Sequence, residues 1–586
     1  MTRLIHTRLR ALRGNPDSGI ALVTVIAVTA VLGILVVSAV AFSIGGMRKA
    51  QTGQSWNGAM AAAYAGVEEY QSQLSNDPAY GRYGNSASSF TGPGSALPPR
   101  PNPAFGLGKT GTWAKVPGSE QAATFRYEVD NSKLFTHGTL RVRSTGKVGT
   151  ETRSVVVDLK QNGFGDYVYF TNYETADPFN TASRCYRYAY DGRPGAPECV
   201  KIAFGNGDVL DGPVHSNDRI VIDCGAKFLK PITTGYKPSS GEAYEQGVGG
   251  CRPTFFEGKA PVSRGVLEMP PTNSEMKKEV RFDLAEEVPV PGCLYTGPTT
   301  VTFNADGTMQ VKSPWTKKVQ ISATAGRDNP ACGVPGTAAG QLGSSGGAKI
   351  QVPDNNVVFV QNVPNVAGDP NTSAVGVTDP TGTCKGSDAK NPVGYPLRYG
   401  GGRTEVAPSS SSYQCRNGDV FVQGNLKGKL TIAAENNVYV VGNIAYADRE
   451  RDVLGLVGQN SVIVHNPIRD VYADQWDRKN AYPLLDSQCG ADRRIDASIL
   501  SVAHTFMVQN TDTIFCYSGK LQVTGSIAQM FRGIVYQNSG YKKEYRYDSR
   551  LSYVSPPKFL SPANIVFGVS TWSEINPVMK ADGSYA

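Results

Sequence analysis

One uninterrupted apolar stretch near the N-terminus constrains this chain more than any other feature. From Ile20 to Met47 the sequence contains no charged residue. At 1.5 Å per residue, a helix over Ile20–Met47 would be about 42 Å long, which exceeds the roughly 30 Å hydrocarbon core of a bilayer. Backbone N–H and C=O groups have no water partners in lipid, so such a segment must be helical there. The stretch therefore predicts a single transmembrane helix.

The residues around this stretch predict its orientation and argue against a cleaved secretory signal. The arginines that precede it are Arg3, Arg8, Arg10 and Arg13. Basic residues stay on the cytoplasmic side, so we expect a cytoplasmic N-terminus and an extracytoplasmic bulk. A secretory signal has a much shorter apolar region and an A-x-A exit, which is not evident here. A permanent single-span anchor in the cytoplasmic membrane remains open.

The apolar stretch begins abruptly after Gly19, where the basic leader ends. This junction resembles the prepilin cleavage site of type IV pilins and type II secretion pseudopilins. The resemblance implies that a prepilin peptidase cuts between Gly19 and Ile20, with N-methylation of the new N-terminus. It also implies that the Ile20–Val40 face packs against other pilins or pseudopilins in a filament.

Further positions in the helix agree with this resemblance in part. Gly33, Ile34 and Leu35 stand where pilins commonly carry Gly-Ile-Leu. Pilins usually have Glu at the fifth mature position, where this chain has Thr24, and they tend to have Pro where it has Ala41. The missing carboxylate speaks against ordinary packing in the filament shaft. It fits the large minor pilins and pseudopilins at or near a filament tip, some of which lack that Glu.

The composition predicts a mainly β protein beyond the helix. The chain has 586 residues with 65 Gly and 37 Pro, which suits turn-rich β structure better than helices. The net charge of +8 is modest for this length, and the sequence contains no dense Lys/Arg run. Nucleic acid is therefore not an expected partner.

All ten cysteines follow the apolar stretch, which indicates an oxidising compartment and disulfides. Pairing of sequence neighbours is the simplest connectivity, although sequence alone does not prove it. Zinc competes less well, because no C-x-x-C or H-x-x-x-H pair occurs. The candidate pairs are Cys185–Cys199, Cys224–Cys251, Cys293–Cys332, Cys384–Cys415 and Cys489–Cys516.

The chain divides into six predicted segments. The β unit after the linker is expected to be a pilin-like meander, with Gly146 and Gly149 in its turns. The segments are a leader (1–19), a transmembrane and stalk helix (20–78), a linker (79–110), the pilin-like β unit (111–162), a β-rich exported domain (163–560) and a C-terminal tail (561–586).

The long β-rich segment consists of short apolar runs that end at Gly or Asn, most clearly over Asp419–Ile444. Such runs favour the stacked coils of a right-handed parallel β-helix or solenoid. The irregular period leaves a β-sandwich as the alternative. Gly212–Asp218 and the run from Gly525 to Pro557 resemble parts of large bacterial pilus-associated surface proteins, in which a pilin helix precedes a β-helical region.

The candidate catalytic patterns are weak, and we expect neither an enzyme nor a cofactor or metal. Gly343–Gly347 spells G-x-S-x-G, but in a Gly/Ser-rich loop without the flanking strand and helix of a nucleophile elbow. His215 lies beside Ser216 and Asp218, but neighbours on one strand point to opposite faces, so we interpret His215 as stabilising a turn.

Two acidic clusters are candidates for a catalytic pair of carboxylates. They are mixed with arginines, which favours solvated surface charge. Their members are Asp448, Glu450 and Asp452, and Asp470, Asp474 and Asp477. A membrane-anchored, polysaccharide-acting β-helical enzyme stays as the alternative function.

Tyr186, Tyr188 and Tyr190 alternate along the chain inside a predicted disulfide loop. Aromatic residues on one strand face are more often core than adhesive surface, so we expect these three to be buried. The sequence as a whole predicts a minor pilin-like surface protein. Its helix would join a pilus or pseudopilus, and its β domain would serve adhesion or assembly priming, with a surface ligand or polysaccharide as a conceivable partner.

Overall fold

A computed structural model describes the chain from residue 20 to residue 585 with short gaps. It shows a mainly β protein with one long N-terminal apolar helix. The predicted leader 1–19, including Gly19, lies outside the described residues. These are 20–93, 95, 97–107, 111–119, 122–134, 139–161, 163–181, 183–249, 252–384, 391–406, 413–473, 479–514, 517–552, 554–562 and 567–585.

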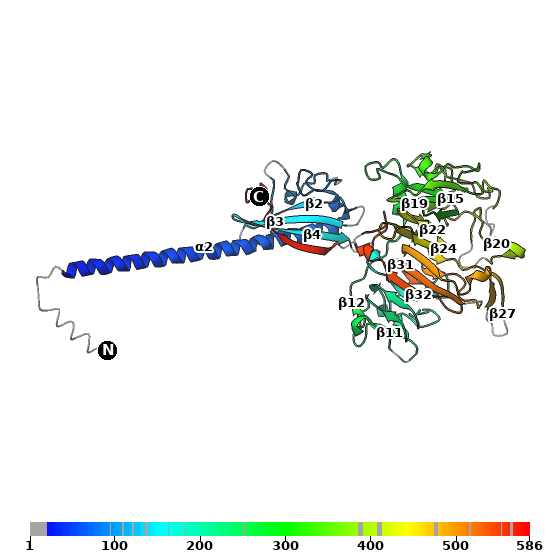
Figure 1. The fold of residues 1–586 in the computed structure, drawn as a ribbon, viewed down its shortest axis with the longest axis horizontal. Coiled ribbons are helices and arrows are strands. Elements are labelled where there is room, and N and C mark those ends of the chain that lie inside the picture. Colours follow the sequence, from blue (N-terminus) through cyan, green and yellow to red (C-terminus); the bar gives the residue numbers. More distant parts are fainter. Residues whose placement is uncertain are drawn as a thin grey trace.

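Helix α2 runs without interruption from Ile20 to Asn76, over 57 residues. It ends just before Pro78, as expected from the restriction that proline places on the preceding residue. Its first half projects alone, and its second half lies against a small sheet (Figure 1). In that second half, buried positions recur every three or four residues, which makes one apolar face. They are Ala59, Ala62, Ala63, Gly66, Val67, Tyr70 and Leu74.

The small sheet has five antiparallel strands in the order β1-β2-β3-β4-β33. Its apolar side chains and the buried face of α2 form one core. We call α2 from Ala59 onward, this sheet and the segments packed on them the head module. The strands are β1 (Ala114–Lys115), β2 (Thr124–Asp130), β3 (Thr139–Val148), β4 (Glu151–Gln161) and β33 (Phe567–Ile575).

Gly146 lies inside β3, which corrects its predicted place in a turn. A Cβ atom at Gly146 would lie 2.1 Å from the carbonyl oxygen of Ala59 and 2.2 Å from the amide nitrogen of Ala63. This glycine therefore lets the backbone of the strand contact the backbone of the helix. Gly149 does lie in the turn after β3, with a φ of 59°.

The predicted linker 79–110 is packed onto the head module where the structure describes it. Its two short 3-10 helices are η1 (Pro78–Arg82) and η2 (Pro103–Phe105). Tyr80 and Phe105 are buried in the same core as Tyr127 of β2. The amide of Asn102 donates to the hydroxyls of Tyr80 and Tyr127 at 2.7 and 2.9 Å. The Ser, Gly and Pro content signalled irregular backbone, but it did not reveal this packing.

The predicted C-terminal tail 561–586 is also part of the head module. Strand β33 pairs with β4 over Phe567–Ile575. The residues after β33 continue across the module, where the carbonyl of Met579 accepts from Thr152 at 2.7 Å and the hydroxyl of Tyr585 donates to Glu128 at 2.7 Å. The expectation failed because the partner strand lies some four hundred residues earlier in the chain. The β-rich segment is thus an insertion between two neighbouring strands.

The inserted β domain contains one large sheet of 20 strands. They are β5 (Tyr169–Ala176), β6 (Val209–Asp211), β7 (Val214–Ser216), β9 (Lys227–Phe228), β10 (Ile232–Thr234), β12 (Val262–Ser263), β13 (Cys293–Thr296), β14 (Thr299–Phe303), β15 (Thr308–Lys312), β18 (Ala348–Gln351), β19 (Asn356–Gln361), β22 (Val420–Leu426), β23 (Lys429–Ala434), β24 (Val438–Tyr446), β25 (Val453–Gly458), β26 (Val462–Val464), β29 (Arg493–Ser501), β30 (Phe506–Val508), β31 (Tyr517–Arg532) and β32 (Gly540–Tyr547).

Four two-stranded pairs complete the β domain. They are β8 (Ile220–Ile222) with β11 (Tyr244–Gln246), β16 (Gln320–Ile321) with β17 (Gly326–Arg327), β20 (Arg398–Tyr399) with β21 (Arg403–Thr404), and β27 (Ile468–Ala473) with β28 (Lys479–Pro483).

Parallel pairing dominates the large sheet. One parallel ladder runs in the order β12-β10-β7-β5-β31-β29-β25-β23-β19-β13. A second runs in the order β14-β22-β24-β26-β30. This differs from a β-sandwich, whose sheets are antiparallel. In the first ladder, apolar residues lie in register on neighbouring strands and are buried, among them Val358, Ile432, Leu456, Ile499 and Ile527.

The chain enters this first ladder in its middle. It starts at β5, moves outward to β12, continues at the far end with β13, and returns to β31, which pairs with β5. Two buried ion pairs cross this seam between the beginning and the end of the insertion. Arg532 binds Glu174 at 2.5 Å, and Lys543 binds Asp208 at 2.8 Å. The two ends of the β domain therefore lie together, next to β4 and β33 (Figure 1).

The close approach at Gly146 leads to a stability prediction. Gly146→Ala should destabilise the head module by about 1–3 kcal/mol, because the added methyl group meets backbone atoms that cannot move independently. Gly165→Ala is a suitable control, since a Cβ there meets nothing within 4 Å. Thermal unfolding of the detergent-solubilised chain measures both. Equal transition temperatures for Gly146→Ala and the parent chain would contradict the proposed contact.

Candidate functional site

The first half of α2 is the main candidate site, and the predicted packing residues all lie on it. Ile20 is the first residue of the helix, and Thr24, Gly33, Ile34 and Leu35 follow within the exposed part. The predicted scissile bond itself cannot be placed, because Gly19 lies outside the described residues. Four of these five residues therefore lie inside the helix, and Ile20 is its first residue.

Every described side chain from residue 22 to residue 54 is exposed. The most apolar 18-residue window of this region has a mean hydropathy of 2.8, and none of that window is buried. A soluble surface rarely exposes more than a few hundred Å² of contiguous apolar area. The large apolar side chains exposed here are Leu22, Val23, Val25, Ile26, Val28, Val31, Leu32, Ile34, Leu35, Val36, Val37, Val40, Phe42, Ile44 and Met47. By length and composition, this helix can cross a membrane.

The hydroxyl of Thr29 in the apolar half fits an environment without water. The hydroxyl of Thr29 donates within the helix to the carbonyls of Val25 and Ile26, at 2.8 and 3.0 Å. Such a bond lets a threonine face lipid or another helix without an unsatisfied polar group. The first charged side chains are those of Arg48 and Lys49, which mark the end of the apolar half.

An aromatic and charged cluster secures the helix where it meets the head module. The guanidinium of Arg153 lies 4.1 Å from the ring centre of Trp56. The hydroxyl of Tyr64 donates to Glu574 of β33 at 2.7 Å, and its ring contacts Trp572 edge-on at 4.8 Å. These contacts tie α2 to both β4 and β33. The apolar half consequently has a fixed direction relative to the sheet.

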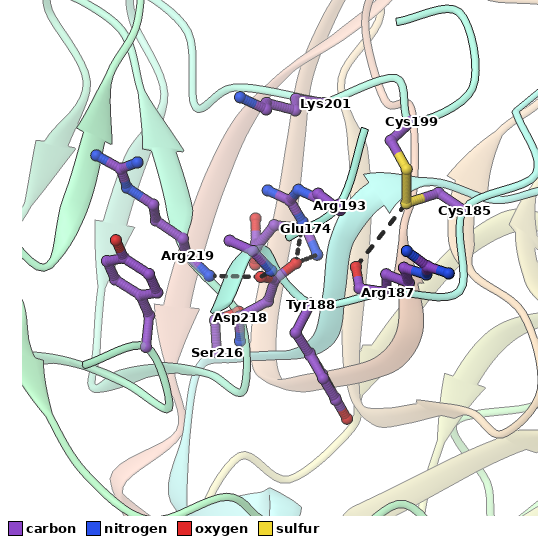
Figure 2. A network of polar contacts seen from close by, with 12 residues as sticks. Glu174, Cys185, Arg187, Tyr188, Arg193, Cys199, Lys201, Ser216, Asp218 and Arg219 are labelled. Atoms are coloured by element: carbon purple, nitrogen blue, oxygen red, sulfur yellow. Dashed lines mark hydrogen bonds and ion pairs between the residues drawn. A yellow bond between two sulfur atoms is a disulfide. The ribbon is translucent and has the colours of Figure 1, made fainter. Parts of the chain in front are cut away.

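A second cluster lies in the β domain, around the loop closed by Cys185–Cys199 (Figure 2). Asp218 is fully buried and binds the guanidinium of Arg193. Its carboxylate also accepts from the backbone N–H groups of Glu174, Ala189 and Arg219, at 3.0, 2.8 and 2.8 Å. Burial raises the pKa of Asp218 above its ordinary value, and these four donors oppose the rise. The cluster anchors the disulfide loop to the strands beneath it.

His215 lies on strand β7 and is buried, so it does not sit in a turn as predicted. Its Nδ1 lies 2.8 Å from the hydroxyl of Thr233 and its Nε2 lies 3.2 Å from the side-chain oxygen of Asn217. The hydroxyl of Ser216 accepts from the backbone N–H of Asp218 instead of facing the imidazole. The three residues thus form no hydrolytic triad, and His215 links neighbouring strands.

The first acidic cluster shows contacts of surface and structural residues. Asp448 binds Arg451 at 2.6 Å, and Asp452 accepts from the backbone N–H groups of Gly428 and Asp448. Asp474 and Asp477 lie outside the described residues. Within the described part of the chain, no group of three or more His, Cys, Asp or Glu side chains is arranged to hold a metal ion.

The tyrosines of the disulfide loop differ from their predicted place in the core. Tyr186 is 62% exposed and Tyr190 is 42% exposed, whereas Tyr188 is half-buried. The prediction assumed a strand, but the segment from Cys185 to Cys199 contains only the short η4 (Ala189–Asp191). Alternation along the sequence therefore carries no information about faces here. Tyr186 and Tyr190 instead lie on an exposed aromatic surface.

Three of the five predicted cysteine pairs are joined in the structure. Disulfides link Cys185 to Cys199, Cys293 to Cys332, and Cys384 to Cys415. Cys224 and Cys489 are also disulfide-bonded. Their predicted partners, Cys251 and Cys516, lie outside the described residues.

Comparison with known proteins gives little further guidance. No protein-family model matches the chain, and no curated protein sequence matches it. Among solved structures, the competence-associated pilin ComZ from Thermus thermophilus aligns with 89% of this chain and 97% of its own, at 12% identity and a TM-score of 0.23. A score this low does not establish a shared fold, so no property of that protein is carried over.

The buried imidazole leads to a pH prediction. Burial lowers the pKa of His215 to about 4, whereas an unfolded histidine titrates near 6.5. Between these values only the unfolded chain binds the proton, so the His215 contribution to stability is lost as the pH falls from 6.5 toward 4. His215→Gln should show a weaker fall of the unfolding temperature over this window than the parent chain. Parallel pH profiles of the two proteins would contradict the assignment.

Proposed function

We propose that this chain is a pilin-type membrane protein whose helix joins a pilus or pseudopilus and whose β domain is displayed outside the cell. One observation carries the proposal: a single continuous helix is divided into an apolar half, exposed on all sides, and a half buried under a sheet. In a soluble protein this apolar half would be unfavourable, because its apolar side chains would all contact water. A membrane provides the apolar surroundings that this half of the helix needs. After assembly, a bundle of similar helices provides them.

The length of the apolar half suits both a membrane and a bundle of neighbouring helices. At about 42 Å, Ile20–Met47 is longer than the roughly 30 Å hydrocarbon core that a spanning helix must cross. The excess length suits a helix that also packs along neighbouring helices after leaving the bilayer. The resemblance at Gly19 and Ile20 adds a processing step, in which a prepilin peptidase removes the basic leader. The mature chain would then begin at the first residue of α2.

Support for a parallel β-helix in the inserted domain comes from the order in which the chain visits the two ladders. Successive segments contribute one strand to each ladder: β19 then β22, β23 then β24, β25 then β26, and β29 then β30. Each pair corresponds to one coil, and aligned apolar residues fill the interior. We infer that this stiff body is the part presented to the surroundings, for adhesion or for priming assembly.

A polysaccharide-acting enzyme has weaker support. Its catalysis needs two carboxylates held about 5–10 Å apart and free to exchange protons or attack a sugar. Asp448 is instead neutralised by Arg451, and Asp452 is committed to backbone N–H groups. A structural role in a filament agrees better with these contacts.

The position that departs from the pilin pattern gives the sharpest test. Thr24→Glu should raise the share of the protein in sheared surface filaments several-fold relative to the membrane fraction, because a carboxylate at the fifth mature position suits the filament shaft. Thr24→Gln is the matched control, because glutamine has the length of glutamate without its charge. It should leave the share in filaments unchanged. Quantitative immunoblotting of both fractions measures this share. Equal shares for all three proteins, or none in the sheared fraction, would refute this role.

A further inference from the structure

A continuous row of aromatic rings lies at the surface of the β domain. We call it the aromatic row, and its members in spatial order are Tyr190, Tyr188, Tyr173, Phe531 and Tyr186. Neighbouring ring centres along this order are 4.9, 4.6, 5.2 and 5.4 Å apart. The first three contacts are stacked or tilted, and the last is edge-to-face. The row joins the disulfide loop to strands β5 and β31, across the seam of the domain.

The ends of the aromatic row face solvent, while its centre is covered. Tyr190 at one end and Tyr186 at the other are the exposed members, and Phe531 in between is buried. Phe179, 61% exposed, packs at 4.8 Å on His504, whose backbone carbonyl accepts from the N–H of Phe531 at 3.1 Å. His504 in turn binds Asp177 at 3.1 Å. Each exposed ring is thus backed by a packed aromatic or imidazole neighbour.

The row is held rigidly. The Cys185–Cys199 disulfide closes the loop that carries three of its tyrosines. The hydroxyl of Tyr188 donates to the side-chain oxygen of Asn172 at 2.8 Å. The N–H of Ala189, between two row members, donates to the buried Asp218, which also binds Arg193 (Figure 2). A ligand that lies on these rings would not have to order them, so little conformational entropy opposes binding.

The charges around the row favour an uncharged ligand. The exposed charged residues within the disulfide loop are Arg187, Asp191 and Glu198, and the exposed Arg184 directly precedes it. Binding of a nucleic acid or another polyanion relies on a surplus of Lys and Arg, which this loop does not provide. These four side chains supply hydrogen-bond donors and acceptors together, as a ligand with many hydroxyl groups requires.

The area of the exposed rings favours a small flat ligand over a protein. An aromatic side chain has about 150–250 Å², so the exposed parts of Tyr186, Tyr190 and the neighbouring Phe179 offer roughly 300 Å². A stable protein interface needs about 800 Å² on each side. A few sugar rings match the smaller area, because the C–H face of a pyranose is apolar and flat while its rim is polar.

We propose that the aromatic row binds a neutral polysaccharide, with sugar rings stacked on Tyr186 and Tyr190 and their hydroxyls bound by the neighbouring arginines and carboxylates. This inference names a partner for the displayed β domain and so deepens the proposed function. The site lies wholly in the β domain, and its binding is independent of leader processing. Failure of one proposal is therefore distinguishable from failure of the other.

Titration of the full, detergent-solubilised chain with defined hexasaccharides tests the proposal. The probes are maltohexaose, cellohexaose, mannohexaose and chitohexaose, with an oligothymidylate as the anionic comparison, and binding is followed by calorimetry. At least one hexasaccharide should bind. Tyr190→Ala and Tyr186→Ala should each weaken it about tenfold, which corresponds to the loss of roughly 1.4 kcal/mol of ring contact. Tyr190→Phe should retain most of the affinity, because the ring remains.

Tyr399→Ala is the matched control, since Tyr399 is an exposed tyrosine on the separate strand β20. It should bind like the parent chain. Absence of binding to all four hexasaccharides would overturn the proposal. So would equal weakening by Tyr399→Ala, tighter binding of the oligothymidylate than of any sugar, or concentration-dependent self-association that is lost in Tyr190→Ala.

Discussion

The pairing of β4 with β33 is the contact on which the rest of the structure depends. These strands complete the sheet that covers α2, yet the entire β domain is inserted between them. Their pairing requires that the two ends of the insertion come together. The β5–β31 ladder and the Arg532–Glu174 ion pair achieve this, because they join the first strand of the β domain to a strand near its end. The ordered insertion thereby avoids the loop-closure entropy that a chain of this length would lose if it were flexible.

This arrangement connects the functional parts mechanically. The helix backbone touches β3 at Gly146, and β33 touches Tyr64 of the helix through Glu574. The direction of the apolar half is therefore set by the same sheet that holds both ends of the β domain.

Local patterns in the sequence predicted much of this architecture. Apolarity without charge predicted the helix, the proline at its end marked its boundary, and short β runs ending in Gly or Asn indicated stacked strands. Neighbour pairing of cysteines matched the three disulfides seen. What could not be predicted depends on contacts distant in sequence. Nothing near Phe567–Ile575 reveals a partner at β4, and nothing around β5 reveals that β31 will lie beside it.

Among the candidate sites, too, local sequence patterns predicted some positions, whereas other positions depend on contacts that those patterns do not reveal. Thr24, Gly33, Ile34 and Leu35 lie on the exposed helix as expected, because their place follows from a continuous helical segment. Tyr186 and Tyr190 were misplaced, because a disulfide loop has no alternating faces on which a burial pattern can act. The sequence around Gly146 predicts a turn, because it cannot show that the backbone of a helix lies against this residue.

The N-terminal residue of the protein recovered from membrane and sheared surface fractions tests the central claim most directly. Mass spectrometry of the N-terminal peptide identifies it. The account predicts a chain that begins at Ile20, with a methylated or free amino group, in both fractions. A chain that begins at Met1 or Thr2 would contradict it, because the helix would then be a permanent anchor and not a processed pilin segment.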